Sequence, residues 1–300
     1  MFQWVKARNP IEFPKLGFEI DPPLGFEIGN FEVRFYGLII AIGMILAVVY
    51  GLKRCRQFGL KQDDIIDGFL WIMPVAVICA RLYYCILEWS SYKSNPISVL
   101  YIWEGGLAIY GGVIGAALCV ILFSKRKKVS LPAVLDLVAI CFLIGQSVGR
   151  WGNFFNREAH GSVTDFFLGM NIRSDSTGYR DTYHPTFLYE SLWNLAGFVL
   201  LHFLSKKRKY DGQIALGYLA WYGLGRTFIE GLRTDSLYFL PEIIGEKIRF
   251  SQVLAAVSCI TAVVILLLKY FYPPRKELFV NSVTREEEAP AAEEKPETEE

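Results

Sequence analysis

The chain has 300 residues, of which 53% are hydrophobic and 20% charged, and its formal net charge is +1. Ordinary soluble domains rarely combine so many apolar residues with so few charges, and here the apolar residues lie in long runs, so the composition excludes that class. The small net charge hides an asymmetry. Residues 275–300 hold nine Glu against four Lys or Arg, so the first 274 residues carry about +6, as is typical of proteins that face an anionic membrane surface.

Seven apolar runs are long enough to cross the hydrocarbon core of a membrane, which takes about 20 helical residues. In chain order they are 36–52, 68–87, 107–123, 131–149, 186–204, 214–228 and 253–270. The first and the sixth are short or interrupted by polar residues. We therefore predict an all-α integral membrane protein with seven transmembrane helices.

The segments outside these runs divide the chain into three parts. They are an extracytoplasmic N-terminal segment at 1–32, the seven-helix domain at 33–272 and a cytoplasmic acidic tail at 273–300. Residues 286–300 are rich in Glu, Pro and Ala and cannot bury a core, so the tail is predicted to be disordered. The sequence LGFEI occurs twice, at 16–20 and 24–28, which indicates a local duplication. The first apolar run begins too late for a cleavable signal peptide.

Positive charge alternates between the loops and predicts the orientation. Basic clusters follow the first, third, fifth and seventh runs, namely Lys53, Arg54, Arg56 and Lys61; Lys125, Arg126, Lys127 and Lys128; Lys206, Lys207, Arg208 and Lys209; and Lys269, Arg275 and Lys276. The intervening loops carry fewer positive charges. By the positive-inside rule the N-terminus lies outside and the C-terminus in the cytoplasm, which requires an odd number of spans.

Ionisable side chains inside the spans gather toward one side of the membrane. Counted at 1.5 Å per helical residue, five of them fall in the outer part of their spans: Arg81, Arg150, Glu190, Arg226 and Glu230. Asp136 is the exception, because it lies near the inner face, where we expect it to be a structural hydrogen-bond partner. Such groups are costly in hydrocarbon and usually face a protein interior or an aqueous cavity. A positive cavity in the outer leaflet suits an anionic phospholipid headgroup, because the arginine fork can bind phosphate oxygens bidentately.

The sixth run presents four polar side chains on one helix face. Tyr222, Arg226, Glu230 and Arg233 follow the spacing i, i+4, i+8 and i+11, which keeps them within about 80° of one another. An i,i+4 salt bridge that merely neutralises an intramembrane arginine explains this spacing equally well. The convergence of arginines from three spans on one leaflet favours a binding site.

Residues 149–161 read GRWGNFFNREAHG. This segment resembles the signature G-R-x-G-N-F-x-N-x-E-x-x-G of the prolipoprotein diacylglyceryl transferases, and every fixed position is filled. Four further segments resemble the same family in the same order: RFYG at 34–37, RLYY at 81–84, HPTFLYE at 184–190 and YGLGRTFIE at 222–230. The resemblance covers roughly 33–270.

The resemblance implies a reaction at the membrane. The thiol of the lipobox cysteine in a preprolipoprotein attacks the glyceryl C3 of phosphatidylglycerol, a thioether forms and glycerol 1-phosphate leaves, as the first step of lipoprotein maturation. It further implies a multi-pass protein of the bacterial cytoplasmic membrane with its site toward the outer leaflet. The expected partners are phosphatidylglycerol, the signal peptide of the preprolipoprotein and the bilayer, without a cofactor, metal or nucleic acid.

The same resemblance assigns site residues. The catalytic residues are Arg150, Arg226 and Tyr110, and the substrate-binding residues are Tyr36, Arg81, Asn153, Asn156, Glu158, Gly161, Tyr222 and Glu230. The two catalytic arginines are expected to hold the phosphate and the two asparagines to orient headgroup hydroxyls. The two glutamates are expected to fix the arginines or to bind the glycerol. The motif glycines either permit tight turns or serve helix packing.

One position departs from the family pattern. Many members carry a histidine before a Gly-Gly pair at the start of the third span, where this chain has Tyr110. A neutral tyrosine is a poor proton acceptor but a good hydrogen-bond partner, so Tyr110 is expected to orient substrate. The general base stays open among His160, His184 and His202, each of which also fits a structural role. A free thiol has a pKa near 8.5, so a weak base is enough.

Two other function classes remain open. A transporter would show paired, interrupted helices in two repeated halves with a site at the midplane, and this sequence has no such symmetry. An inactive lipid-binding scaffold is suggested by Tyr110 but opposed by the retained arginines and loop motif. The six cysteines show neither a CxxC pair nor a Cys/His ligand spacing, so they are predicted to pack as small hydrophobic residues rather than bind zinc.

Overall fold

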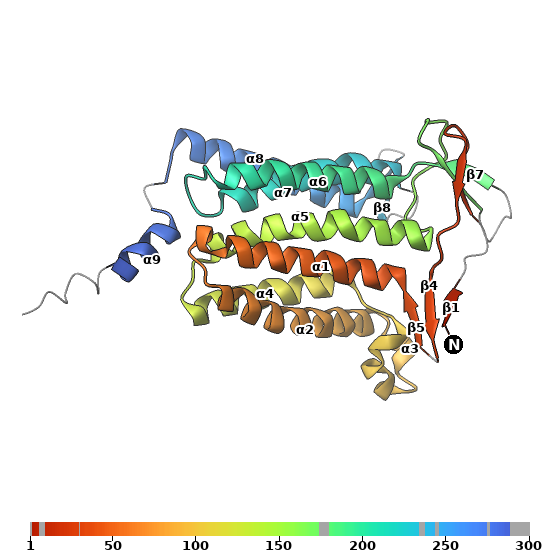
Figure 1. The fold of residues 1–300 in the computed structure, drawn as a ribbon, viewed down its shortest axis with the longest axis horizontal. Helices are drawn as coiled ribbons and strands as arrows, with labels where there is room; N and C mark the ends of the chain where they lie inside the picture. The colour runs from red at the N-terminus through yellow and green to blue at the C-terminus, as the bar shows by residue number, and fades with distance from the viewer. Residues whose placement is uncertain are drawn as a thin grey trace, which may run out of the picture. The chain divides into compact units, whose positions relative to one another are not determined.

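The computed structural model describes residues 2–5, 10–29, 31–173, 180–233, 238–243, 246–274 and 277–288. Its long helices are α1 (Phe35–Arg54), α2 (Gln62–Leu87), α4 (Ile109–Lys127), α5 (Leu131–Asn156), α6 (Thr186–Ser205), α7 (Gln213–Ile229) and α8 (Phe250–Phe271) (Figure 1). Each corresponds to one of the predicted apolar runs. The short helices are η1 (Cys55–Phe58), α3 (Trp89–Tyr92), η2 (Pro96–Leu100), η3 (Ile102–Glu104), η4 (Glu230–Leu232) and α9 (Phe279–Glu288).

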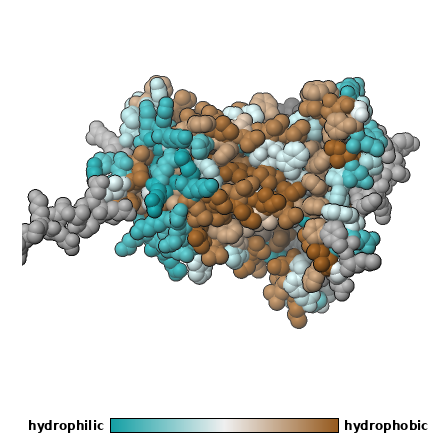
Figure 2. Space-filling view, viewed as in Figure 1, coloured by the Kyte–Doolittle hydropathy of each residue, from teal (hydrophilic) through white to brown (hydrophobic). Residues whose placement is uncertain are grey.

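Within the described part of the chain, six helices are long and apolar enough to cross a membrane, and α7, with 17 residues, is shorter than the others. Their outer surfaces carry large apolar side chains that lie open, such as Leu70 on α2 and Ile260 on α8. In the space-filling view, apolar side chains gather over the middle of the helices and hydrophilic ones near their ends (Figure 2). Exposed apolar surface of this extent is stable only against lipid, so the protein is a multi-pass helical membrane protein.

The chain divides into two compact units. The first consists of Met1–Val49 and Val138–Lys276, and the second of Tyr50–Leu137 and Glu277–Glu300. In the first unit α6 lies beside α7, and α7 beside α8. In the second, α2 and α4 form a closely packed pair, since a Cβ on Gly115 would lie 2.5 Å from the Cβ of Cys79. The six cysteines are free, as the sequence predicts.

Short antiparallel sheets lie outside the membrane helices. One has the order β1 (Phe2–Val5), β4 (Gly25–Ile28), β5 (Phe31–Arg34), and a second β3 (Phe18–Ile20), β2 (Ile11–Phe13), β6 (Met170–Arg173), β7 (Arg180–Tyr183). A third pairs β8 (Tyr238–Ile243) with β9 (Glu246–Arg249). Hence the prediction of an all-α chain is right for the membrane part and misses these strands. These strands have three to six residues and are too short to show a clear period of two.

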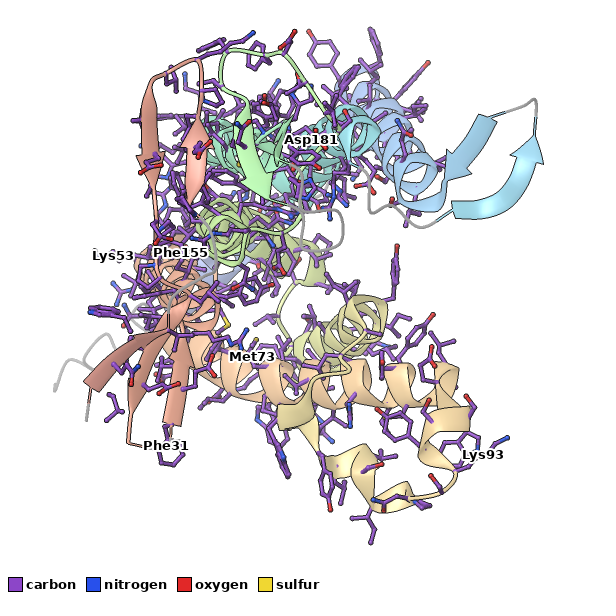
Figure 3. The ribbon with its side chains drawn as sticks, turned by 90° about the vertical axis from the view of Figure 1, so that its right-hand side faces the viewer. Phe31, Lys53, Met73, Lys93, Phe155 and Asp181 are labelled. Carbon is purple, nitrogen blue, oxygen red and sulfur yellow. The ribbon has the colours of Figure 1, made fainter. Side chains whose placement is uncertain are left out.

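The N-terminal segment is part of the fold. The two copies of LGFEI contribute β3 and β4, which belong to different sheets. A buried cluster joins the second sheet to the C-terminal end of α5 and the N-terminal end of α6, and consists of Ile11, Phe13, Phe154, Met170, Ile172 and Phe187. At the start of β5, Phe31 is 79% exposed and points away from its sheet (Figure 3).

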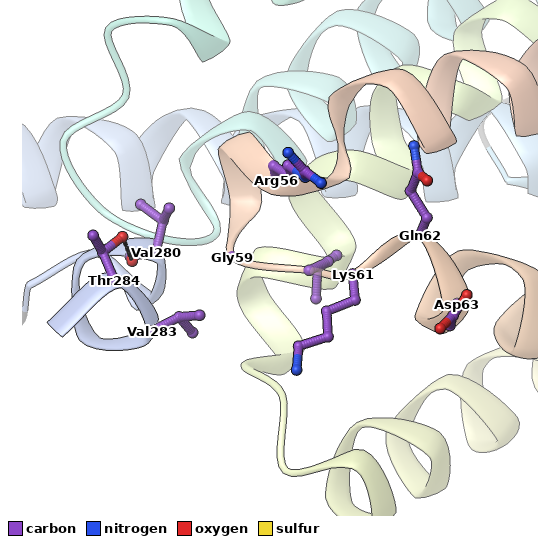
Figure 4. A pocket seen from close by; sticks show the side chains of 9 residues that line it. Arg56, Gly59, Lys61, Gln62, Asp63, Val280, Val283 and Thr284 are labelled. Atoms are coloured by element: carbon purple, nitrogen blue, oxygen red, sulfur yellow. Dashed lines mark hydrogen bonds between the residues drawn. The ribbon is translucent and has the colours of Figure 1, made fainter. Parts of the chain in front are cut away.

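Residues 279–288 correct the prediction of a disordered tail, because they form α9. Phe279, Val280 and Val283 give this helix one apolar side. That side packs against the turn at Gly59 (φ +74°), where a Cβ would lie 2.9 Å from Phe279 Cδ1. A cavity of about 580 Å³ beside it is lined by η1, the start of α2 and α9 (Figure 4). None of the predicted site residues lines this cavity, and residues 289–300 of the predicted tail lie outside the described residues.

Candidate active site

The signature segment forms the end of a helix and a tight turn. Helix α5 continues seven residues beyond the predicted end of its span, to Asn156, so Gly149 and Gly152 are helical rather than turn residues. Gly152 serves packing, because a Cβ there would lie 2.9 Å from Cδ2 of Tyr36. The chain then turns through Arg157 (φ 56°) and Ala159 (φ 54°), both left-handed. The close contact at Gly152 therefore holds Tyr36 against α5.

Glu158 bonds to both signature asparagines. Asn153 Nδ2 donates to Glu158 Oε1 at 3.0 Å and Asn156 Nδ2 to the same oxygen at 3.4 Å. These two residues are three apart, so they share a face of the last turns of α5. Asn156 Oδ1 is buried and has no hydrogen-bond partner among the described residues. An acceptor left open in this way suits a hydroxyl donor from outside the chain.

A cluster of arginines surrounds Glu190, whose side chain is 4% exposed. Arg150 Nη2 lies 2.6 Å from Glu190 Oε2, and Arg226 Nη1 lies 3.3 Å from both carboxylate oxygens. Arg233 Nη1 approaches Oε1 at 3.8 Å. The helices α5, α6 and α7, together with η4, thus bring three guanidinium groups to one buried carboxylate.

A second carboxylate completes the cluster. Glu230 Oε2 lies 2.6 Å from Arg226 Nη2, and Ser251 Oγ donates to Glu230 Oε1 at 2.8 Å. The i,i+4 salt bridge weighed from the sequence is therefore present, and it occurs together with the convergence of Arg150 and Arg226. Counted over the described residues, three arginines and two carboxylates give the cluster one formal positive charge. The arginine side chains are 14–22% exposed while both carboxylates are 4% exposed, so an anion would meet guanidinium groups first.

Tyr222, one turn before Arg226, stacks on Tyr218 with ring centroids 5.5 Å apart. Gln146 Nε2 of α5 donates to the Tyr218 hydroxyl at 3.0 Å. These contacts fix the tyrosine face of α7 against α5. Tyr222 therefore lies on the same helix face as the arginine, as the spacing predicts.

Gly161 has a backbone role. Its N–H donates to His184 O at 2.9 Å, and it forms an isolated β-bridge with Arg233. A Cβ at this position would lie 2.7 Å from His184 Cβ and 3.0 Å from Leu232 O. Because Gly161 has no side chain, the signature loop can pass close to the end of η4, directly before Arg233. This contact explains the glycine without a substrate.

Arg81 belongs to the second unit, where its guanidinium donates four hydrogen bonds to backbone carbonyl oxygens. Its Nε donates to Val99 O at 2.9 Å, Nη2 to Ser98 O at 2.8 Å, and Nη1 to Gly105 O at 2.5 Å and Gly106 O at 3.1 Å. The residue is 5% exposed. These bonds fix the segment from η2 to the start of α4. In this arrangement Arg81 supports a loop, and its role in substrate binding stays a prediction.

Tyr110 also belongs to the second unit and is the second residue of α4. It follows Gly105 (φ +89°) and Gly106 (φ +71°), the glycines to which Arg81 bonds. Tyr110 is half-buried. The segment that carries it is thus held by Arg81.

Two of the three histidines, His160 and His184, lie in loops of the first unit. His184 Nδ1 is 3.2 Å from the Tyr189 hydroxyl, and burial lowers the pKa of His184, which favours its neutral form at pH 7. His160 Nδ1 donates to Gly161 O at 3.2 Å, and its ring packs on Tyr183. His202 lies at the opposite end of α6, in its last turn. A neutral imidazole can accept a proton, so His184 stays a candidate for the base.

Two members of the cluster, Glu190 and Arg233, are not among the site residues predicted from the sequence. The sequence predicts Glu190 only as an ionisable group within a span and Arg233 only as a residue on the polar face of the sixth run. The signal for Arg233 was its i+11 spacing from Tyr222, and that for Glu190 was its place at the end of HPTFLYE. Neither signal indicates that the two side chains meet.

The chain is similar to proteins of one family over most of its length. A family model described as prolipoprotein diacylglyceryl transferase matches residues 23–268. A phosphatidylglycerol–prolipoprotein diacylglyceryl transferase of Clostridium novyi (strain NT) is 43% identical over 249 residues, which cover 82% of this chain and 95% of that relative. Proteins of the same name from Bacillus velezensis and Enterococcus faecalis are 42% and 41% identical and cover 82% and 84% of this chain and 92% of each relative. The chain therefore belongs to the prolipoprotein diacylglyceryl transferase family.

Proposed function

We propose that this protein transfers the diacylglyceryl group of phosphatidylglycerol to the lipobox cysteine of prolipoproteins. The observation that carries the proposal is the cluster of Arg150, Arg226 and Arg233 around Glu190. Its net positive charge, its buried carboxylates and its partly open arginines suit the phosphate of an anionic lipid. The relatives bear the name of this reaction, which agrees with the chemistry of the cluster.

In the proposed step the thiolate sulfur forms a bond to glyceryl C3 and the C3–O bond to phosphate breaks. Glycerol 1-phosphate leaves with the bonding electrons, and the thiol proton passes to a base. Negative charge grows on the departing phosphate, and guanidinium groups already held in place by carboxylates stabilise it without reorganisation. Arg150 and Arg226 bind the phosphate in this proposal, and the open acceptor of Asn156 binds a headgroup hydroxyl.

The topology proposed is seven spans in the bacterial cytoplasmic membrane, with the N-terminus outside and the site in the outer leaflet. Helix α7 supports the seventh crossing because it continues into η4, so that helical structure covers 213–232. Such a length is about what the hydrocarbon core requires. The alternating basic loops support the orientation.

The experiment that tests the function is a transfer assay. Purified protein receives phosphatidylglycerol and a lipobox peptide, and both glycerol phosphate release and peptide mass are followed. We expect equal molar release and a peptide mass increased by one diacylglyceryl group. A folded, lipid-bound protein that releases nothing would favour the scaffold, and lipid or ion flux in vesicles without release would favour a transporter.

Tyr110→Phe is expected to retain transfer activity within about tenfold of wild type, because an orienting hydroxyl contributes one hydrogen bond of about 1 kcal/mol. The measurement is kcat in the transfer assay, with folding checked by thermal unfolding in detergent. Complete loss of transfer in a folded variant would contradict the orienting role and make the hydroxyl essential.

A further inference from the structure

Helices α6 and α7 carry the same five-residue pattern, a tryptophan followed four residues later by a glycine. These residues are Trp193 and Gly197 on α6, and Trp221 and Gly225 on α7. The two helices lie side by side (Figure 1). Their indole rings stack with centroids 4.4 Å apart and an interplanar angle of 17°. Trp193, Gly197 and Trp221 lie outside the segments that resemble the family, and Gly225 lies within the one at 222–230. None of the four belongs to the arginine cluster.

The two indoles are hydrogen-bonded reciprocally across the helix pair. Trp193 Nε1 donates to the carbonyl oxygen of Trp221 at 3.0 Å, and Trp221 Nε1 donates to the carbonyl oxygen of Trp193 at 2.9 Å. A helix carbonyl has a second lone pair free beyond its intrahelical bond. An indole N–H without an acceptor is costly in an apolar medium, so each ring is held to the opposite backbone.

The glycines make room for the rings. A Cβ on Gly197 would overlap the indole of Trp221, and a Cβ on Gly225 would overlap that of Trp193. Both glycines are buried. We call these four residues the Trp–Gly clasp. Because each ring fits one gap and bonds one carbonyl, the clasp restricts both the sliding and the rotation of α6 against α7.

The clasp lies close to the Glu190–Arg226 ion pair. Glu190 precedes Trp193 by three residues, which is about 4.5 Å toward the N-terminus of α6. Arg226 follows Trp221 by five residues, which is about 7.5 Å toward the C-terminus of α7. Since α6 and α7 are joined by a short loop and run in opposite directions, both steps lead toward the same end of the pair. A slip of one helix would therefore change the 3.3 Å distances from Arg226 Nη1 to the Glu190 oxygens.

We propose that the Trp–Gly clasp is a positioning device that sets the register of α6 against α7 and so holds Arg226 in place for transfer. The inference rests on the proposed function. The four residues act through the Glu190–Arg226 pair and are positioning residues. Displacement of a catalytic group by about 1 Å can lower a rate by up to about a hundredfold, so a small slip is enough to matter.

Trp193→Phe keeps an aromatic ring and removes the donor to α7. We expect kcat to fall by about tenfold or more, with KM for the lipobox peptide changed less than about twofold. Gly225→Ala, which forces the Trp193 ring aside, is expected to reduce kcat further. The matched controls are Trp71→Phe, at a 64% exposed position on α2, and Gly217→Ala, whose Cβ would meet only the end of Leu201. Both controls are expected to retain wild-type kcat.

A second background separates positioning from stability. Arg226→Lys keeps the charge but loses the planar guanidinium. In this variant the register of α6 against α7 no longer positions a guanidinium, so we expect it to have no effect on the rate. In that background Trp193→Phe is expected to leave the residual kcat unchanged, while its shift in thermal unfolding persists. Equal rate losses in both backgrounds, or a wild-type kcat for Trp193→Phe, would overturn the proposal. A wild-type protein without any transfer would refute the proposed function instead, so the two failures are distinguishable.

Discussion

Replacing Arg226 or Arg150 with alanine is expected to reduce transfer by at least about a hundredfold, the loss typical when one preorganised donor to a developing negative charge is removed. Both guanidiniums converge on Glu190 from different helices, so the phosphate loses one arm of its binding site in either variant. The measurement is kcat/KM for phosphatidylglycerol with a saturating lipobox peptide. We expect the loss mainly in kcat, because the charge grows in the transition state.

The matched control is Arg126→Ala, an exposed arginine in the last turn of α4. This variant removes one positive charge from the protein without touching the cluster, and its turnover is expected to equal that of wild type. The phosphate-binding role would be contradicted if Arg226→Ala or Arg150→Ala showed near-normal turnover. The variant protein must bind lipid and unfold at the wild-type temperature for this comparison.

Glu190→Gln is expected to be the most destabilising of the conservative changes. The buried carboxylate is shared by three guanidinium groups, and its neutralisation leaves Glu230 as their counter-charge among the described residues of the cluster. Loss of one partner from a buried ion pair typically costs about 3–5 kcal/mol. We therefore expect a large fall in the thermal unfolding temperature and a loss of transfer activity in the same variant.

Glu32→Gln provides the comparison for this prediction. Glu32 pairs with Arg34 at 2.8 Å on the exposed strand β5, and exposed pairs contribute about 1 kcal/mol or less. Its unfolding temperature is expected to stay close to that of wild type. If Glu190→Gln unfolded at the same temperature as Glu32→Gln and kept its turnover, the cluster would not depend on a central carboxylate.

For Arg81 the sequence predicts the helix that carries the residue but not the groups that its side chain contacts. The sequence predicts that Arg81 lies in a membrane helix, and α2 contains it. Its position in the outer half of the span stays a prediction. The four carbonyl oxygens that bind it come from residues 98–106, a segment whose path depends on its own glycines and on α4. The spacing of residues in the sequence does not predict that this segment accepts hydrogen bonds from the guanidinium of Arg81.

The membrane class, the positions of the long helices along the chain and the family can be predicted from the sequence without a structure. Apolar runs near 20 residues report the hydrocarbon thickness directly, and the signature at 149–161 is local, so neither needs information about distant parts of the chain. The tertiary structure alone decided what depends on contacts between distant residues. It made Glu190 the shared partner of Arg150, Arg226 and Arg233, built the sheets from runs too short to show a period, and held α9 in the predicted tail against Gly59. The physical reason is that these elements are stabilised by partners far along the chain rather than by their own residues.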